Sequence, residues 1–208
     1  MPRRSVLLFG GLVLVAAVVV AIATMVAVGG RDRAPTGSQT VSATGQPSVG
    51  GPFSLVDQDG HPVDQTMLDG KWTLVFFGFT WCPDYCPTTL AALKATQERL
   101  GDRADNLQIV FISVDPERDS PSVLKDYLSS DGFPKGVIGL TGTPAQIRAA
   151  ADAYRAYYQK VGEGEGYTMD HSLTVYLMGP DGKFRSPLAG DLAPDRAAEV
   201  IRRAMDRG

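Results

Sequence analysis

The sequence predicts an α/β protein with a central mixed sheet flanked by helices and an N-terminal transmembrane helix. Two near-continuous apolar runs, Trp72–Phe79 and Leu107–Val114, are typical of buried central strands in a largely parallel sheet. Helical patterns lie between and after these runs, and this strand–helix–strand order implies right-handed crossovers with helices on both faces of the sheet. An uncharged segment near the N-terminus predicts the membrane-spanning helix.

Shorter strands surround the two central ones. Phe53–Val56 is expected to be a strand, and it is followed by the turn Asp57–Gly60. Leu173–Leu177 is expected to be a third buried strand, and Gly182 sets a hairpin that returns the chain at Phe184.

Four helices are expected, and three of them have recognisable start signals. A helix from about Pro87 to Leu100 places its leucines on one face. Ser120-Pro121 is a cap followed by proline, and Thr143–Gln146 combines a capping box with proline, which starts a helix that we expect to reach about Lys160. The last helix begins near Pro194. Its apolar side consists of Ala197, Val200, Ile201, Ala204 and Met205.

The N-terminal segment predicts export of the rest of the chain. Val6–Val28 is a run of 23 residues without a charge, which is long enough to span a bilayer and too long for the apolar part of most signal peptides. Arg3 and Arg4 precede it, which places the N-terminus in the cytoplasm. We expect an uncleaved membrane anchor over residues 1–28. A cleaved signal peptide is the alternative, because Ala21 and Ala23 form an Ala-x-Ala site.

Composition divides the remainder into a linker and one domain. Residues 29–51 are rich in Gly, Ser, Thr, Pro and Gln and are expected to form a flexible linker, and residues 52–208 have the length of one domain. Of the 20 Lys and Arg and 23 Asp and Glu, residues 34–208 keep 16 and 22, a balance of −6. An acidic domain argues against nucleic acid as a partner. With two Cys and two His, the chain has neither a disulfide framework nor a His-rich metal cluster.

Both cysteines lie in one motif, Thr80–Pro87, between a predicted strand and a predicted helix. Cys82 and Cys86 therefore lie at the carboxyl end of a sheet strand, where open α/β folds place their sites. A helix N-terminus stabilises thiolate, and residues four apart on a helix share a face. Both sulfurs are thus expected to reach one ion, and soft thiolates suit Cu(I) or Zn.

The cysteine pair is also compatible with other functions. A structural disulfide would close a short loop and gain little stability. A thiol–disulfide oxidoreductase is a second possibility, although it usually has two residues between its cysteines rather than three. A peroxide-reducing cysteine needs Thr or Ser three residues earlier, and Phe79 stands there in front of Cys82.

A third ligand would favour a metal site, and the sequence offers two histidines. His61 lies in a turn and is expected to be exposed. His171 directly precedes the predicted strand Leu173–Leu177, whose start is expected near the other strand ends. The glycine-rich segment Val161–Gly166 is expected to act as a hinge before it. We therefore expect His171 to meet the two cysteines, since imidazole binds Cu(I), Cu(II) and Zn.

Several motifs in order resemble the Sco/SenC family, whose members assist assembly of the copper site of cytochrome c oxidase. The resemblance covers about residues 50–206. It rests on Thr80-x-Cys82-Pro83-Asp84-x-Cys86-Pro87, Ser113–Asp119, Asp170-His171-Ser172 and Tyr176–Gly182.

The resemblance implies a thioredoxin-like fold and a copper site made by Cys82, Cys86 and His171, with copper as Cu(I), Cu(II) or both. It implies a membrane-tethered copper chaperone in the cell inner membrane, single-pass, with the C-terminal domain on the periplasmic or extracytoplasmic side. The implied partners are a cytochrome c oxidase subunit or another copper-site protein, an upstream copper donor and the membrane. The alternative function is a thiol–disulfide oxidoreductase that keeps the target's copper-ligand cysteines reduced.

Two acidic features near the motifs each allow more than one role. The loop Asp115–Asp119 is expected to be structural or solvated, or else to border the copper loop and present charge to a partner. Asp170 is a candidate acceptor for the His171 ring, although neighbouring residues of a strand point in opposite directions.

Overall fold

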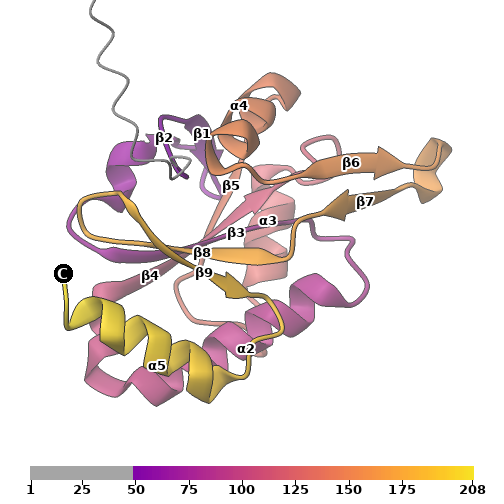
Figure 1. Ribbon diagram of the computed structural model, residues 1–208. Helices are drawn as coiled ribbons and strands as arrows, with labels where there is room; N and C mark the ends of the chain where they lie inside the picture. The colour runs from indigo at the N-terminus through magenta and orange to yellow at the C-terminus, as the bar shows by residue number, and fades with distance from the viewer. Residues whose placement is uncertain (1–48) are drawn as a thin grey trace, which may run out of the picture. The chain divides into compact units, whose positions relative to one another are not determined.

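A computed structural model describes residues 49–208. Seven strands form one sheet in the order β2-β1-β5-β4-β3-β8-β9, and two further strands, β6 and β7, form a separate ribbon (Figure 1). The expected transmembrane anchor and nearly all of the expected linker lie outside the described residues. Within residues 49–208, none of the helices has the length and apolar character needed to cross a membrane.

The centre of the sheet is buried. Strand β3 (Trp72–Gly78) is buried at every residue, and it pairs in parallel with β4 (Leu107–Ser113). Strand β4 pairs in parallel with β5 (Ile138–Thr141). On the other side, β8 (Thr174–Met178) is antiparallel to β3, and β9 (Phe184–Ala189) is antiparallel to β8. The sheet is therefore mixed as expected, but the expectation of largely parallel pairing was wrong, because only the β3–β4–β5 part is parallel.

At the opposite edge, β1 (Ser54–Asp57) is antiparallel to both β2 (Pro62–Asp64) and β5. The expected turn is confirmed, since the Gly60 N–H donates to the Asp57 carbonyl at 3.0 Å and Gly60 has a positive φ of 86°. Short 3-10 turns lie at Gln65–Leu68, Gly101–Asn106 and Gly164–Gly166.

The helices begin close to the positions that the sequence predicts. They are α2 (Tyr85–Leu100), α3 (Pro121–Leu128), α4 (Pro144–Tyr154) and α5 (Pro194–Met205). The Ser120 hydroxyl accepts a hydrogen bond from the backbone N–H of Val123 at 3.4 Å. The capping box between Thr143 and Gln146 is present, with its backbone and side-chain bonds both made. These local signals are satisfied within each helix and need no distant contact.

Helix α4 is shorter than expected: it ends at Tyr154 rather than near Lys160. Arg155 takes a left-handed conformation with φ 55°, which terminates the helix. The following residues form β6 (Tyr158–Val161), which pairs antiparallel with β7 (Thr168–His171). Cross-strand hydrogen bonds of this ribbon thus replace the helical bonds that the sequence pattern suggested.

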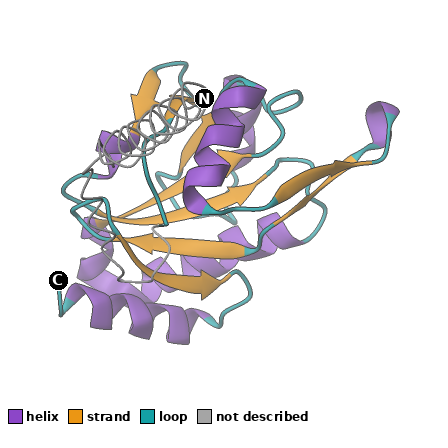
Figure 2. Ribbon diagram, turned by 45° about the horizontal axis from the view of Figure 1, so that its top comes forward, coloured by secondary structure: helices purple, strands orange, loops and turns teal. Residues whose placement is uncertain are grey.

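Helices cover both faces of the sheet, as expected. On one face, Phe76 of β3 packs against Phe111 of β4, and Phe111 packs against Tyr127 of α3. Helices α2 and α5 pack together on this face. On the other face, Phe77 packs against Tyr154 of α4, with ring centroids 5.5 Å apart. Figure 2 shows α4 on the opposite side of the sheet from α2 and α5.

The last residues of the expected linker contact this domain. Val49 is partly buried against the core, and the Gly50 N–H donates to the Ala153 carbonyl at 2.9 Å. Gly50 has φ 88°, and a Cβ there would lie 2.7 Å from the Met178 side chain. The chain therefore enters the domain across α4 and β8.

Candidate metal centre

The two cysteines lie where β3 runs into α2. Cys82 is in the connecting loop, and Cys86 is in the first turn of α2. Both thiols are free, with 8% and 0% of the respective residues exposed. The Asp84 side chain does not cap the helix, and the Cys86 N–H instead donates to the Cys82 sulfur at 3.3 Å. The Cys82 sulfur thus occupies the positive end of the helix, which favours its thiolate form.

Gly78, the last residue of β3, lets the Cys86 sulfur approach the sheet. A Cβ at this position would lie 2.8 Å from the Cys86 Sγ and 2.8 Å from the ring of Phe111. Only glycine leaves room for both groups. The sequence analysis missed this residue, although a glycine inside an otherwise apolar strand is a known sign of close approach.

His171 ends β7 and faces the thiols. Its Nε2 lies 3.5 Å from the Cys86 Sγ, and its Nδ1 lies 3.0 Å from the Ser172 carbonyl oxygen. A carbonyl only accepts hydrogen bonds, so Nδ1 carries the proton and Nε2 presents a lone pair to the sulfur. The rings of Phe79 and Phe76 pack edge-on against the imidazole, with centroids 5.8 and 6.2 Å away.

The three ligand atoms form one group. The sulfurs of Cys82 and Cys86 and a ring nitrogen of His171 all lie within 4.8 Å of one another. The sequence-predicted residues are therefore brought together from elements separated by 85 positions along the chain. His61 is not among them: it is exposed and lies 3.4 Å from the Asp57 carboxylate, as expected for a turn residue.

The two thiols differ in acidity. The hydrogen bond from the Cys86 side chain lowers the pKa of Cys82 to about 4 despite its burial, and the His171 side chain and the N–H groups of Cys86 and Asp84 add to this effect. The same hydrogen bond, burial and the negative charge on Cys82 raise the pKa of Cys86 well above its ordinary value. Both shifts favour a copper-free pair that shares one proton at neutral pH, with the negative charge on the Cys82 side.

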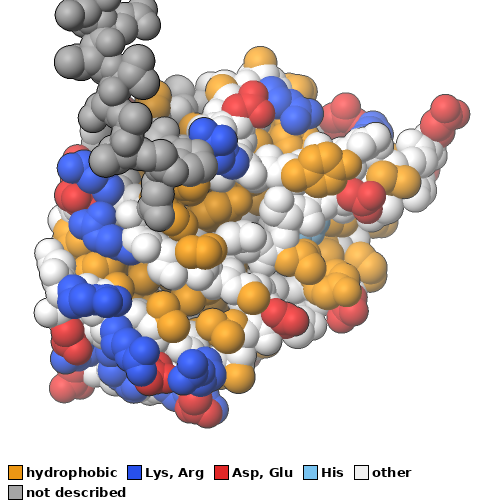
Figure 3. Space-filling view, viewed as in Figure 1, with side chains coloured by type: hydrophobic (Ala, Val, Ile, Leu, Met, Phe, Trp, Pro, Cys, Tyr) orange, Lys and Arg blue, Asp and Glu red, His pale blue; other side chains and the backbone are white. Residues whose placement is uncertain are grey.

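The site opens to the surface through an apolar rim. A pocket of about 370 Å³ is lined by Cys82 and His171. Tyr85, Tyr157 and Leu173 also line it and are 56%, 57% and 38% exposed, and Trp81, next to Cys82 in the chain, is 66% exposed. Figure 3 shows hydrophobic side chains gathered beside the β6–β7 ribbon on this face.

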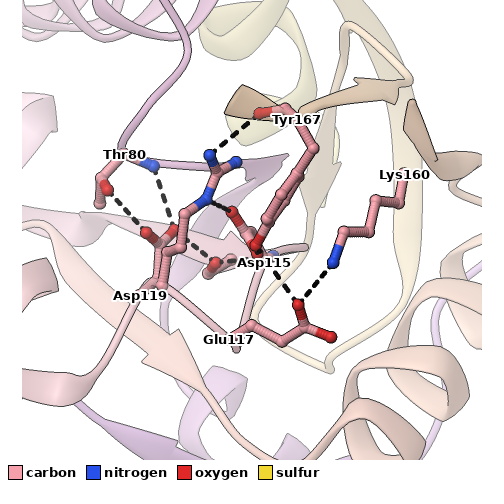
Figure 4. A network of polar contacts seen from close by, with 8 residues as sticks. Thr80, Asp115, Glu117, Asp119, Lys160 and Tyr167 are labelled. Carbon is pink, nitrogen blue, oxygen red and sulfur yellow. Dashed lines mark hydrogen bonds and ion pairs between the residues drawn. The ribbon is translucent and has the colours of Figure 1, made fainter. Parts of the chain in front are cut away.

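The loop Asp115–Asp119 is structural, and its two aspartates are buried rather than solvated. Asp119 accepts hydrogen bonds from the N–H and hydroxyl of Thr80, at 3.0 and 2.6 Å, and from the Ser113 hydroxyl at 2.6 Å. Burial raises the pKa of its carboxyl group, and these hydrogen bonds oppose that rise. Figure 4 shows how this network reaches from Thr80, close to Cys82, to Tyr167 at the ribbon.

Two candidate features near His171 lie elsewhere. Asp170 is exposed, and the His171 Nδ1–H donates its hydrogen bond to the Ser172 carbonyl instead of to Asp170. The glycine-rich segment Val161–Gly166, expected to act as a hinge, does not lie next to the histidine. It closes the far end of the ribbon, where Val161 pairs with Thr168, while His171 pairs with Tyr158 at the other end.

Comparisons with known proteins agree with this architecture. A family model described as SCO1/SenC matches residues 41–206. Protein SCO1 homolog 1, mitochondrial, of Arabidopsis thaliana is 43% identical over 144 residues, which are 68% of this chain and 42% of that protein. Protein SenC of Rhodobacter capsulatus is 40% identical over 163 residues, covering 78% of this chain and 72% of that protein. The chain spans about half the length of several mitochondrial relatives.

Solved structures show the same fold. ScoI of Bradyrhizobium japonicum with copper bound is 46% identical with a TM-score of 0.68, covering 75% of this chain and 99% of that one. Yeast Sco1 with copper bound is 38% identical with a TM-score of 0.71, covering 77% of this chain and 90% of that one. With a family model that covers most of its length, the chain belongs to the SCO1/SenC family.

Proposed function

We propose that this chain is a membrane-tethered chaperone that carries one copper ion on Cys82, Cys86 and His171 to a copper site of cytochrome c oxidase. The observation that carries the proposal is the convergence of two sulfurs and one imidazole nitrogen within 4.8 Å. Soft thiolates suit Cu(I), and the added imidazole suits Cu(II) as well. Relatives of the same fold have been solved with copper bound.

The protonation of the site fits a cargo that is taken up and released. Because the pKa of Cys82 is lowered to about 4, we expect an arriving ion to meet one charged donor and the lone pair of the His171 Nε2. Cys86 gives up its proton as the second sulfur binds, and we expect release of about one proton per copper at neutral pH. Return of this proton weakens the second bond when a partner offers its own ligands.

The surface supports transfer to a protein partner. Both cysteines are buried, so an acceptor must contact the rim to exchange ligands. Of the six large apolar side chains exposed in residues 49–208, five lie next to Cys82 in the chain, on this rim or on the ribbon: Trp81, Tyr85, Tyr157, Val161 and Leu173. Aromatic residues of this kind are typical of interface centres. We propose a cytochrome c oxidase subunit or another copper-site protein as the acceptor, and a separate copper donor upstream.

The membrane tether and the compartment rest on the sequence. Val6–Val28 is the proposed anchor and residues 29–51 the proposed linker, which together would hold domain 52–208 on the periplasmic or extracytoplasmic side of the inner membrane. Bacterial and mitochondrial relatives are consistent with membrane association.

A copper titration tests the proposal. The reduced full-length chain in detergent is titrated with Cu(I) and then with Cu(II) against a competing chelator. We expect a one-to-one complex and, with Cu(II), a sulfur-to-copper charge-transfer band. Cys82→Ala and Cys86→Ala should each weaken binding by more than about 100-fold, beyond the loss typical of residues outside the ligand set.

The two histidines provide the control. His171→Ala should weaken the complex and change its spectrum, whereas His61→Ala should alter neither, because His61 lies in an exposed turn. Unchanged copper affinity and spectrum in His171→Ala would overturn the three-ligand site. Absence of any stable complex in the wild-type chain would overturn the chaperone.

A thiol–disulfide reductase is the second candidate, favoured by the unequal acidity of the thiols. The Cys82 thiolate would attack a disulfide in the target and form a mixed disulfide, releasing one target thiolate. Cys86, on losing its proton, would then attack the Cys82 sulfur. This leaves a Cys82–Cys86 disulfide and a fully reduced target, with two electrons transferred. One solved relative, BsSco, is 30% identical with a TM-score of 0.60, and a disulfide switch is described in that protein.

The two candidates differ in their need for His171. A reductase should reduce an oxidised model dithiol at nearly the wild-type rate in His171→Ala. A chaperone should lose copper affinity in that variant, whatever its reductase rate.

A further inference from the structure

The ribbon that carries His171 is not part of the main sheet. Strands β6 and β7 pair only with each other, and three of the four residues of β6 are exposed. A two-stranded ribbon is marginally stable by itself. The main sheet therefore holds the ribbon only through its short links to α4 and β8, and side-chain contacts with the body must hold the rest of it.

Tyr167, directly before β7, makes the most extensive of these contacts. It is 8% exposed, and its hydroxyl donates to Asp115 at 2.6 Å. The Arg118 guanidinium lies over its ring at 3.6 Å from the centroid and donates to its carbonyl at 3.0 Å. Ring, hydroxyl and backbone of Tyr167 are thus all held by the loop after β4.

The same loop also fixes the thiol side of the site. Asp119 binds the N–H and hydroxyl of Thr80, two residues before Cys82. The Arg118 guanidinium lies 5.4 Å from the Trp81 ring centroid and 5.9 Å from that of Phe79. Figure 4 shows the loop between Thr80 on one side and Tyr167 on the other.

We propose that Arg118, stacked on Tyr167 and paired with Asp115, is the positioning residue that holds the His171 ribbon against the thiol loop, residues 79–84, which carries Cys82. The inference deepens the proposed copper function and rests on it. Arg118 makes no contact with copper. It acts through Tyr167 and the ribbon, and so controls how firmly the His171 imidazole is held beside the two sulfurs.

Burial separates this pair from ordinary surface charges. The side chains of Arg118 and Asp115 are 16% and 3% exposed, and the two are ion-paired. The Arg118 Nη2 is buried without a hydrogen-bond partner among the described residues. A buried ion pair with an unsatisfied donor contributes little net stability, so stability alone does not account for it. Arg148, stacked on Tyr158 at 4.1 Å, also contacts the ribbon but not the thiol loop.

The first experiment measures copper binding in a double-mutant cycle on the full-length chain. Arg118→Gln should weaken Cu(II) binding by about 10- to 100-fold, the range for residues that orient a ligand, and reduce the His171 nitrogen coupling in the Cu(II) resonance spectrum. Cu(I), held mainly by two thiolates, should bind within about threefold of wild type. In a His171→Ala background, Arg118→Gln should have no further effect on Cu(II) affinity.

A matched control and a second variant keep the test clear. Arg185 also pairs with a carboxylate, Asp181, and lies 5.9 Å from the Trp72 ring centroid, at the opposite end of β3, so Arg185→Gln should bind Cu(II) as wild type does. If Arg118→Gln does not fold, Tyr167→Phe keeps the ring and removes only the hydroxyl with its hydrogen bonds to Asp115 and Glu117, and it should show a smaller loss of the same kind. An equal loss with and without His171 would overturn the proposal, as would unchanged nitrogen coupling.

The second experiment needs no copper, and it separates failure of the inference about Arg118 from failure of the proposed copper function. Amide hydrogen exchange of the copper-free chain should rise about tenfold or more at Thr168–His171 in Arg118→Gln, while Val75–Phe77 of the sheet stays protected. If the wild-type protein binds no copper while the ribbon of Arg118→Gln loosens in this way, the proposed function is overturned and Arg118 remains the ribbon's support. A ribbon that stays equally protected in Arg118→Gln would overturn the inference itself.

Discussion

The thiol half and the imidazole half of the site are held in different ways. Cys82 and Cys86 follow β3, a strand buried at all seven residues and paired on both sides. His171 ends a ribbon that lies outside the sheet and is held by side chains of the Asp115–Asp119 loop. Backbone pairing in the core thus sets the sulfur positions, whereas the imidazole position depends on a short link to β8 and on a few side-chain contacts.

This difference assigns the two halves different roles in handling a cargo. A carrier must hold its ion and also release it, and ligand exchange begins where the site yields most easily. We expect His171 to leave the ion before either sulfur does, because the ribbon can move without breaking the sheet. The rim beside it is where a partner's ligands would enter.

The largest expected effect is a difference in reactivity between the two cysteines of the thiol half. At about pH 6, iodoacetamide should modify Cys82 in preference to Cys86 by about a hundredfold or more, since thiolate is the reactive form. A lowered pKa of about 4 keeps Cys82 ionised above that pH, so its rate should stay flat between about pH 6 and 8 and fall only as the pH approaches 4. Peptide mass spectrometry of the reduced, copper-free chain gives both rates. A Cys82 rate that rises about tenfold per pH unit over this range would indicate an ordinary thiol.

A glycine in each half gives the next comparison. Gly78→Ala places a Cβ 2.8 Å from the Cys86 sulfur and should lower the free energy of unfolding by about 1–3 kcal/mol, the usual cost of overpacking. Gly166→Ala, at the ribbon tip with nothing within 4 Å, should change it by less than about 0.5 kcal/mol. Denaturant unfolding of the reduced, copper-free chain measures both. Equal stability of the two variants would mean that β3 does not confine the sulfur.

The smallest effect is expected within the ribbon. Lys160 pairs with Glu117 at 2.7 Å and its Nζ lies 3.8 Å from the Tyr167 ring centroid, but the side chains of Lys160 and Glu117 are 44% and 60% exposed. Lys160→Gln should cost less than about 1 kcal/mol in unfolding free energy, as for most surface pairs. Its ribbon amides should exchange within about threefold of wild type, far from the effect expected for Arg118→Gln. If Lys160→Gln loosens the ribbon as much as Arg118→Gln does, any ion pair to the ribbon, rather than the Arg118 stack in particular, holds it in place.

Features with local causes were predictable from the sequence. The apolar runs that become β3 and β4, the caps at Ser120 and Thr143, and the strand–loop–helix setting of the cysteines all follow from neighbouring residues. The end of α4 was not predictable in this way, because residues 158–161 pair with a strand about ten positions later. The roles of Gly78 and Arg118 depend on atoms still farther along the chain.

By itself, the sequence determined the chemistry: a pair of thiols at a helix start, one histidine that could join them, and the family to which these motifs point. Only the tertiary structure decided the geometry. It placed Nε2 of His171 toward Cys86 by giving Nδ1 to the Ser172 carbonyl, and it turned the Asp115–Asp119 loop into a buried support for both halves. The physical reason is range: caps and strand patterns are satisfied within a few residues, whereas these contacts join segments that only folding brings together.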